Sequence, residues 1–405
     1  MKRYQLWLAM LAAVALAATL TAGGARAEGP RHEVYGFAMV DMGYMGTAVD
    51  PKWFDTMRPS KLPAFKDEFG KDGQTFVGMR QSKLGVKSWI PVGDHELRTT
   101  FEFDLYGVGV DAGQTTIRPR IMYGEWGKWG GGQIMSPFMD VDVFPNCLDY
   151  WGPGGMLFFR NPQIRWMPLQ GDRSVTLALE RPGASGDLGV VQDSVVSGSI
   201  IPSYTVPDLS GNARLVQKWV YVQLGGIVRR IGWTDMATTP TTDRSGSVTG
   251  WGVQLSSNIT RFKDSVVRLQ GVYGEGIQNY FNDAPVDVAA GTDAGSPRTG
   301  FIKGVALPIT GVTAFIDHTW NPKFTSTFGY SQNVIDNSDL QHANAFHMGQ
   351  YALANLLYTP DPKIMGGAEV GYEKRTNNAD GFTVDNWVLH ISLKYNFSGT
   401  FGGGQ

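Results

Sequence analysis

The residues with the most evident chemical potential are arginines at the polar positions of alternating apolar and polar segments. A guanidinium is charged at every physiological pH and binds carboxylates through paired hydrogen bonds, whereas an ammonium acts as a point charge. Several such groups around a constriction favour small organic anions. The candidate pore-lining anion contacts are Arg80, Arg98, Arg118, Arg120, Arg165 and Arg268.

The same arginines also have a structural interpretation. Glu102, Asp104 and Glu180 lie at polar positions too, and they are possible ion-pair partners across a lumen. Such pairs would brace a wall and leave less charge for a solute. From the sequence alone, bracing and solute contact are equally open for each arginine.

Motifs of catalysis and metal binding are absent from the printed sequence. It contains no GxSxG, HExxH or CxxC pattern and no phosphate-binding loop, and its six histidines are scattered. Its single cysteine, Cys147, excludes an internal disulfide. We therefore expect no catalytic residue, no metal ligand and no cofactor. A hydrolase site assembled in space at one rim is a less favoured alternative.

The first 27 residues have the pattern of an export signal. An apolar core at 6–20 follows a basic start, and Ala25-Arg26-Ala27 matches a signal peptidase site. Removal of 1–27 leaves 28–405 as one domain. Three basic residues leave with the signal, so the net charge changes from −2 to −5. A nucleic-acid binder normally carries a basic surplus, so we expect no nucleic-acid partner.

Alternating side chains predict strands with one apolar and one polar face. In 385–397, every second residue from Trp387 is apolar, and the residues between them, including His390 and Lys394, are polar. Such strands suit lipid on one side and a wet lumen on the other. The pattern recurs at 97–105, 163–166 and 174–180, and Tyr35, Phe37 and Met39 alternate with small Gly36 and Ala38.

The connections between these segments alternate between short and long. Short turns are predicted at 93–95, 127–131, 170–172, 217–218, 263–264, 321–323 and 360–362. Longer connections rich in Gly, Pro and Asp are predicted at 47–72, 107–115, 139–160, 182–211, 235–246, 281–310, 336–345 and 376–383. Short periplasmic turns and long external loops are typical of an outer-membrane barrel.

These patterns predict an all-β fold, a closed antiparallel transmembrane β-barrel of about 16 strands, each of about ten residues or more. An even number of strands puts both ends on the periplasmic side and lets the first strand pair with the last, so no edge faces hydrocarbon unpaired. A barrel of this size leaves an aqueous channel. The predicted location is the outer membrane of a double-membraned bacterium, among its lipid and lipopolysaccharide.

One connection is unusually rich in aromatic residues. Exposed, such a loop would promote aggregation, so we expect 138–160 to fold into the barrel and narrow it. Burial against another subunit is the alternative. The residues expected in this constriction loop are Phe138, Asp140, Asp142, Phe144, Tyr150, Trp151, Phe159 and Arg160.

At this loop the sequence resembles the DcaP-like trimeric outer-membrane porins. The resemblance rests on RQSKLGVKSWIPV, FEFDLYG, YGEWGKWGGGQIMSPFMDVDVFPNCLDYWGPGGMLFFRNPQIRW, ALERPGASGD and VQLGGIVRRIGW. It implies a sixteen-stranded barrel, a homotrimer and passive uptake of small anions, dicarboxylates in particular. It also implies that the loop around 138–159 constricts the pore opposite an anion ladder of Arg80, Arg118, Arg120 and Arg165.

Two features depart from the family pattern. The barrel is expected to begin near His32, without the helical extension of some members, so trimer contacts would rest on the barrel wall. A Gly-rich tail from Ser398 to Gln405 follows the terminal aromatic Phe397, whereas such barrels usually end on an aromatic residue.

The leading hypothesis is an outer-membrane porin for passive diffusion of small, preferentially anionic solutes such as dicarboxylates or aromatic acids. It is expected to work without a cofactor. A structural or adhesive barrel with a plugged pore is the alternative from another functional class, and it would conduct no ions.

Overall fold

The computed structural model describes residues 29–195, 198–237 and 242–403. The predicted signal peptide, 1–27, lies outside the described residues. In the part of the chain that the structure describes, no helix is both long and apolar enough to cross a membrane.

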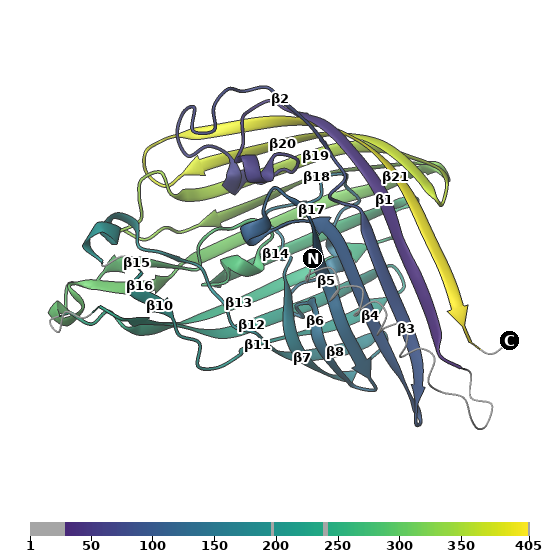
Figure 1. The fold of residues 1–405 in the computed structure, drawn as a ribbon, viewed down its shortest axis with the longest axis horizontal. Helices are drawn as coiled ribbons and strands as arrows, with labels where there is room; N and C mark the ends of the chain where they lie inside the picture. The colour runs from purple at the N-terminus through teal and green to yellow at the C-terminus, as the bar shows by residue number, and fades with distance from the viewer. Residues whose placement is uncertain (1–28, 196–197, 238–241, 404–405) are drawn as a thin grey trace, which may run out of the picture.

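Sixteen antiparallel strands pair in chain order and close into a barrel (Figure 1). Closure is complete because the last strand pairs with the first, from Arg31 opposite Gly402 to Met45 opposite Val388. The predicted fold class and strand number are confirmed. The barrel strands are β1 (Arg31–Met45), β3 (Lys83–Val92), β4 (His95–Tyr106), β5 (Thr115–Trp126), β6 (Trp129–Met135), β7 (Arg160–Leu169), β8 (Arg173–Glu180), β11 (Asp208–Gln217), β12 (Val220–Asp235), β13 (Gly246–Ile259), β14 (Ser265–Glu275), β17 (Pro308–Asn321), β18 (Phe324–Ile335), β19 (Phe346–Asp361), β20 (Ile364–Asn377) and β21 (Thr383–Gly402).

The long connections carry the remaining elements. Two short strands extend the barrel wall, β2 (Gln74–Gly78) against β1 and β10 (Ile200–Pro202) against β12. A separate small sheet joins β9 (Gly186–Asp187), β15 (Val288–Thr292) and β16 (Ile302–Ala306). The 3-10 helices are η1 (Pro51–Trp53), η2 (Pro59–Lys61), η3 (Gly109–Asp111), η4 (Val141–Val143), η5 (Gly189–Ser194), η6 (Gln278–Tyr280) and η7 (Pro297–Thr299).

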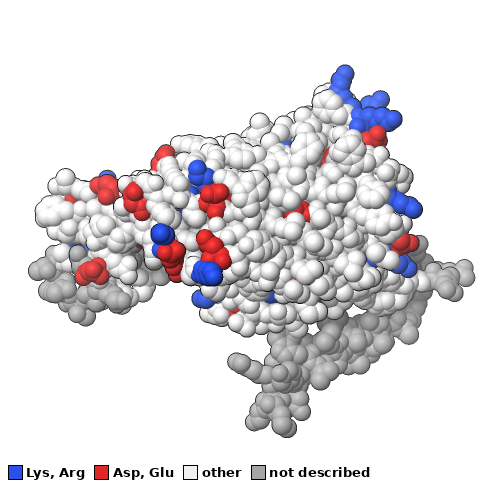
Figure 2. Space-filling view, turned by 90° about the horizontal axis from the view of Figure 1, so that it is seen from above, with Lys and Arg blue, Asp and Glu red and all other residues white. Residues whose placement is uncertain are grey.

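The outer and inner faces of the wall differ as the alternation predicts. On β21, Trp387 is 59% exposed while its neighbour Asn386 is 1% exposed. Leu389 and Ile391 face outward in the same way, and His390 is buried inside. Figure 2 shows a largely uncharged band across this face, with charged side chains gathered toward the two ends. Such a band fits the hydrocarbon layer, since lipid-facing charge is costly.

The first strand corrects the sequence prediction. Tyr35, Phe37 and Met39 lie on the inner face, because the hydroxyl of Tyr35 donates to Glu102 on β4 and Met39 is buried against the lumen contents. The outer positions instead hold small residues such as Gly36, then the exposed Val40 and Met42. A Cβ atom on Gly36 would lie 2.1 Å from the carbonyl oxygen of Lys83 on β3, so glycine is required there.

Three smaller corrections concern strand ends. The predicted C-terminal tail is part of β21 as far as Gly402, and Phe401 stacks on His32 of β1. The turn predicted at 127–131 is shorter, because β6 begins at Trp129. Strands β6 and β8, with 7 and 8 residues, are shorter than predicted. A Cβ atom on Gly132 of β6 would lie 2.1 Å from a carbonyl oxygen of β5, so glycine at this position allows β5 and β6 to lie close together.

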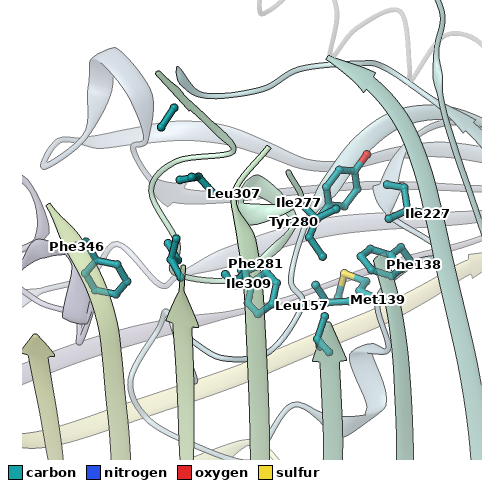
Figure 3. Close-up of a cluster of buried hydrophobic side chains, with 13 residues drawn as sticks. Phe138, Met139, Leu157, Ile227, Ile277, Tyr280, Phe281, Leu307, Ile309 and Phe346 are labelled. Atoms are coloured by element: carbon teal, nitrogen blue, oxygen red, sulfur yellow. The ribbon is translucent and has the colours of Figure 1, made fainter. Parts of the chain in front are cut away.

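An apolar cluster lies inside the barrel, toward the ends of several strands (Figure 3). It joins Phe138 and Leu157 from the connection between β6 and β7 with Ile227 of β12 and Ile309 of β17. Tyr280 from η6 completes the contacts between two inward loops and the wall. Burial of these side chains holds the connection inside, at roughly 25 cal/mol for each Å² of apolar surface removed from water.

Candidate functional site

Residues 136–159, which we name the inner loop, are fastened to the wall by hydrogen bonds. The carboxylate of Asp140 accepts hydrogen bonds from Tyr221 of β12 at 2.8 Å and Ser256 of β13 at 2.6 Å. The Leu157 amide donates to the side chain of Gln270 on β14 at 2.9 Å. The inner loop is thus attached to strands far from its own ends.

A second anchor lies across the barrel at Glu369 of β20. Its carboxylate accepts from the amides of Leu148 and Asp149 at 2.8 and 2.9 Å. The side chain of Asn355 on β19 donates to the same carboxylate at 3.0 Å and to the carbonyl of Asn146 at 2.8 Å. These bonds satisfy backbone N–H groups of the inner loop that would otherwise be buried without a hydrogen-bond acceptor.

Asp149 also connects the inner loop to the connection that follows β1. Its carboxylate accepts from the hydroxyl of Thr56 at 2.8 Å and from the amide of Met57 at 3.0 Å. Tyr351 of β19 donates to it at 3.1 Å. Burial raises the pKa of Asp149, and the donors around its carboxylate act in the opposite direction.

Basic side chains gather on another part of the wall, and we name Lys83, Arg118, Arg120, Arg160 and Lys394 the basic wall. They come from β3, β5, β7 and β21. The ammonium groups of Lys83 and Lys394 lie 5.4 and 5.3 Å from the ring centre of Phe37. The charge of Arg160 lies close enough to those of Arg118 and Arg120 to repel them.

Two carboxylates of β4 neutralise part of this charge. Arg118 binds Asp104 at 2.6 Å, and Arg120 reaches Glu102 at 2.9 Å and Asp104 at 2.8 Å. Lys83 lies 3.2 Å from Glu102. Two of the three acidic partners that the sequence suggests are therefore confirmed. Glu180 instead accepts hydrogen bonds from the hydroxyls of Ser136 and Ser210.

Tyr150 of the inner loop meets the basic wall directly. Its hydroxyl accepts a hydrogen bond from Arg120 at 2.5 Å, accepts another from Arg118 and donates to Asp104. Its ring stacks on Tyr106 of β4 with ring centres 4.0 Å apart. The inner loop thus contacts the charged wall through this side chain.

Several basic side chains of the inner face form no ion pair with a carboxylate in the described part of the chain. In the basic wall they are Arg160 and Lys394, and elsewhere they include Arg165 of β7, Lys87 of β3 and Arg375 of β20. Arg160 lies over the ring of Phe158 at 4.9 Å, and its Nε atom is buried without a hydrogen-bond partner. Arg165 donates to the side chain of Gln163 at 2.6 Å and to the carbonyl of Met135. These are the charges least committed to carboxylates of the protein.

The remaining predicted arginines lie elsewhere and are paired. Arg80, between β2 and β3, is buried against Asp55 and Tyr106. Arg98 is exposed beside a short turn and pairs with Glu96 at 2.9 Å. Arg268 of β14 pairs with Asp317 at 2.6 Å. The structure therefore brings together Arg118, Arg120 and Arg160, and it places Arg98 and Arg268 apart from them. Arg80 shares the ring of Tyr106 with Arg118, at 4.0 and 5.8 Å from the ring centre, but its charge is taken up by Asp55.

The other predicted residues of the constriction loop pack on one another or on neighbouring loops. Phe138 and Phe159 contact Tyr280, and Phe144 packs against Phe158. Trp151 meets Trp53 edge to face at 4.7 Å. Asp142, in contrast, is about half exposed and pairs with Arg214 of β11 at 2.6 Å.

Sequence reasoning missed Lys83 and Lys394 as members of the cluster. Lys394 could have been found from its position on the polar face of the last strand. It lies three residues before Phe397, on the inner side of β21. It also missed Arg214, which stacks on Tyr221 at 3.6 Å and fixes the exposed part of the inner loop. Neighbourhood in the barrel, rather than in the chain, brings these residues together.

Recesses lie on the short-turn side of the inner loop. One of about 690 Å³ is lined by Phe144, Arg268 and His318, and another of about 500 Å³ by Phe144 and Arg214. Within residues 29–195, 198–237 and 242–403, no group of three or more His, Cys, Asp or Glu side chains is arranged to hold a metal ion.

Comparisons with known proteins agree with this architecture. A family model described as DcaP outer membrane protein matches residues 70–271. The fold is similar to the outer membrane channel DcaP of Acinetobacter baumannii, with 20% identity, a TM-score of 0.75 and coverage of 93% of this chain and 100% of that chain.

Two further solved structures share the fold at lower similarity. An anion-selective porin from Comamonas acidovorans has 8% identity, a TM-score of 0.56 and coverage of 91% of this chain and 100% of that chain. The trimer form of OmpT from Vibrio cholerae has 14% identity, a TM-score of 0.52 and the same coverage. No curated protein matches the chain. At these identities the structural likenesses establish the fold.

Proposed function

Because this chain belongs to the DcaP outer membrane protein family, a family of the outer membrane of Gram-negative bacteria, we propose that it is a porin for small, preferentially anionic solutes. The family is one of outer membrane proteins and not of enzymes. The observation that carries the anion preference is the basic wall, where five cationic groups face the tip of the inner loop.

The charge balance of this wall supports an anion preference. Glu102 and Asp104 are engaged by Lys83, Arg118 and Arg120, while Arg160 and Lys394 bring further positive charge without an ion-pair partner among the described residues. The carboxylate of Asp41, whose charge acts on Lys394, accepts a hydrogen bond from Ser392 at 2.6 Å and keeps its charge, so the five basic groups face three carboxylates, Glu102, Asp104 and Asp41. The local excess is therefore positive although the whole chain is slightly acidic.

The arrangement suits weak and reversible contact. The side chains of Arg118 and Arg120 are only 16% and 14% exposed, and each already has a carboxylate partner. A solute carboxylate meets a positive field at this wall without displacing those partners, which favours entry and allows release. A solute with two carboxylates can interact with two of these cationic groups at once, so dicarboxylates are our preferred substrate class.

The inner loop is the proposed constriction. Its contacts with β12, β14, β19 and β20 hold it inside the barrel, and Tyr150 brings its tip to the basic wall. Solutes would then pass between this loop and the charged wall. A plugged structural barrel has the same loop contacts, and it differs by conducting no ions.

We also propose that the protein is a homotrimer. Support comes from the fold shared with OmpT of Vibrio cholerae in its trimer form. Light scattering of the detergent-solubilised protein, with the detergent mass subtracted, should give three times the mass of one chain. A monomer mass in mild detergent would contradict this part of the proposal.

Uptake of solutes into proteoliposomes tests the function. Swelling should be faster in succinate than in the neutral diamide of succinate or in a diamine of similar size. Equal rates for all three solutes would contradict an anion preference. No swelling at all, with a correctly folded barrel, would favour the plugged structural barrel.

A further inference from the structure

A pocket of about 330 Å³ lies among the long loops and shares no residue with the basic wall or the inner loop. The small sheet of β9, β15 and β16 forms one side, and β10 and the end of β12 form the other. Figure 1 shows β10, β15 and β16 close together at the end of the barrel away from the C-terminus. We name this cavity the mouth pocket.

The lining of the mouth pocket is mostly apolar. Its larger apolar side chains are Leu188, Ile200, Ile231, Trp233, Val288 and Ile302. The indole nitrogen of Trp233 donates to the carbonyl of Arg244 at 2.5 Å, and the hydroxyl of Tyr204 accepts from the Ala184 amide at 2.8 Å. The polar atoms of both rings are thus already bonded, which leaves their carbon surface for a ligand.

Two cationic side chains, Arg244 and Lys303, also line the pocket. The guanidinium of Arg244 approaches Asp235 only to 3.6 Å, and its Nε atom is buried without a hydrogen-bond partner among the described residues. The lining carboxylate, Asp187, already accepts from the Gly189 amide at 2.8 Å and from Gln341 at 2.9 Å. The pocket therefore combines apolar walls with an unused donor and net positive charge.

We propose that the mouth pocket binds an organic anion with an apolar ring body, of the aromatic carboxylate class. The ring would lie against Trp233 and Ile302, and the carboxylate would bind Arg244. Small-molecule sites usually have this composition, with apolar walls and a few polar groups that orient the ligand. The inference rests on the proposed function, which supplies the negative charge of the solute. The solute would bind in the mouth pocket before it reaches the basic wall.

Calorimetric titration of the purified, detergent-solubilised protein with 2-naphthoate tests the inference. Acetate carries the charge without the ring, and 2-naphthylmethanol carries the ring without the charge, so both should bind at least tenfold more weakly. Arg244→Gln should weaken 2-naphthoate binding about tenfold, because a charge-assisted hydrogen bond is lost. Ile302→Trp should fill the pocket and abolish binding.

The matched control is Arg298→Gln, which removes the same charge from a neighbouring loop. Arg298 is 80% exposed, pairs only with Asp243 in the described residues and does not line the pocket. Its binding should equal that of the wild type. The inference would be overturned if Arg244→Gln and Arg298→Gln weakened binding equally, or if Ile302→Trp left binding unchanged. It would also be overturned if 2-naphthylmethanol bound as tightly as 2-naphthoate, because the pocket would then bind apolar bodies such as acyl chains without regard to charge.

Because the titration measures binding and not permeation, the two proposals can fail separately. Slow succinate uptake with intact 2-naphthoate binding would contradict the porin proposal alone. Fast uptake without binding would contradict the mouth pocket alone. Folding of each variant is checked by its β-sheet circular dichroism and by the heat-dependent shift of its electrophoretic mobility.

Discussion

Two parts of the inner face use charge in opposite ways. At the anchors of the inner loop, Asp140, Asp149 and Glu369 are buried and accept hydrogen bonds from hydroxyls and amides of the protein. On the basic wall, Arg160 and Lys394 have no carboxylate partner among the described residues. The comparison teaches that a charged residue on the inner face either holds a loop in place or stays available to a solute. The hydrogen-bond and ion-pair partners of the residue show which of these roles it has.

The largest expected effect comes from removing the paired arginines of the basic wall. Arg118→Gln with Arg120→Gln leaves Asp104 buried without its cationic partners, and breaking such a pair typically costs about 3–5 kcal/mol. We expect a lower unfolding temperature and a shift to cation selectivity. Unchanged stability would show that these arginines do not brace the wall.

The next effect tests the anchor side. Glu369→Ala removes the acceptor of the Leu148 and Asp149 amides, and we expect a loss of about 2–4 kcal/mol in the free energy of unfolding. Glu369→Gln, which keeps one acceptor oxygen, should lose less. Denaturant titration in detergent measures both, and equal losses would contradict the role of this carboxylate as a double acceptor.

Removal of the unpaired charges of the basic wall is expected to have a smaller effect on stability but a clear effect on permeation. Arg160→Gln with Lys394→Gln should change the free energy of unfolding by about 1 kcal/mol or less, because no ion pair is broken. The permeability ratio of chloride to potassium should fall several-fold. Lys128→Gln with Lys323→Gln, which removes two exposed lysines of short turns, is the charge-matched control, and a similar fall in that control would locate the selectivity elsewhere.

The smallest effect sharpens the contact between the two sides. Tyr150→Phe removes the hydroxyl that bonds Arg118, Arg120 and Asp104 but keeps the ring that stacks on Tyr106. We expect a loss of about 1 kcal/mol in the free energy of unfolding, typical of one net hydrogen bond. Single-channel current should rise slightly as the loop tip loosens. A complete loss of current would contradict the proposed position of Tyr150.

Most of the fold follows from the sequence because alternation and turn length are local properties. The turn at 170–172 and the outward residues of β21 lie where turn composition and alternation place them, whereas the turn predicted at 360–362 lies at 362–363 because β19 continues to Asp361. The failure at Tyr35 and Phe37 has a local cause as well. Aromatic residues there line the inner face and carry bound lysines, so hydrophobicity alone assigns them to the wrong side.

The site is less predictable than the fold because its pairs join distant parts of the chain. Arg80 and Arg118 are the same residue type, and the sequence predicts both to line the pore. Arg80 is covered by Asp55 from the connection after β1, whereas Arg118 faces Tyr150 of the inner loop. Only closure of the barrel places Lys394 of the last strand beside Lys83 of β3. Which arginine is buried and which meets the lumen is therefore fixed by loop packing.

The zero-current potential of the wild-type channel across a potassium chloride gradient tests the central claim most directly. We expect the wild-type potential to have the sign of a channel that is more permeable to chloride than to potassium. The Arg160→Gln and Lys394→Gln double variant should give a smaller potential of the same sign. A potential with the sign of potassium permeation in the wild type would contradict the claim that the unpaired charge of the basic wall governs what passes.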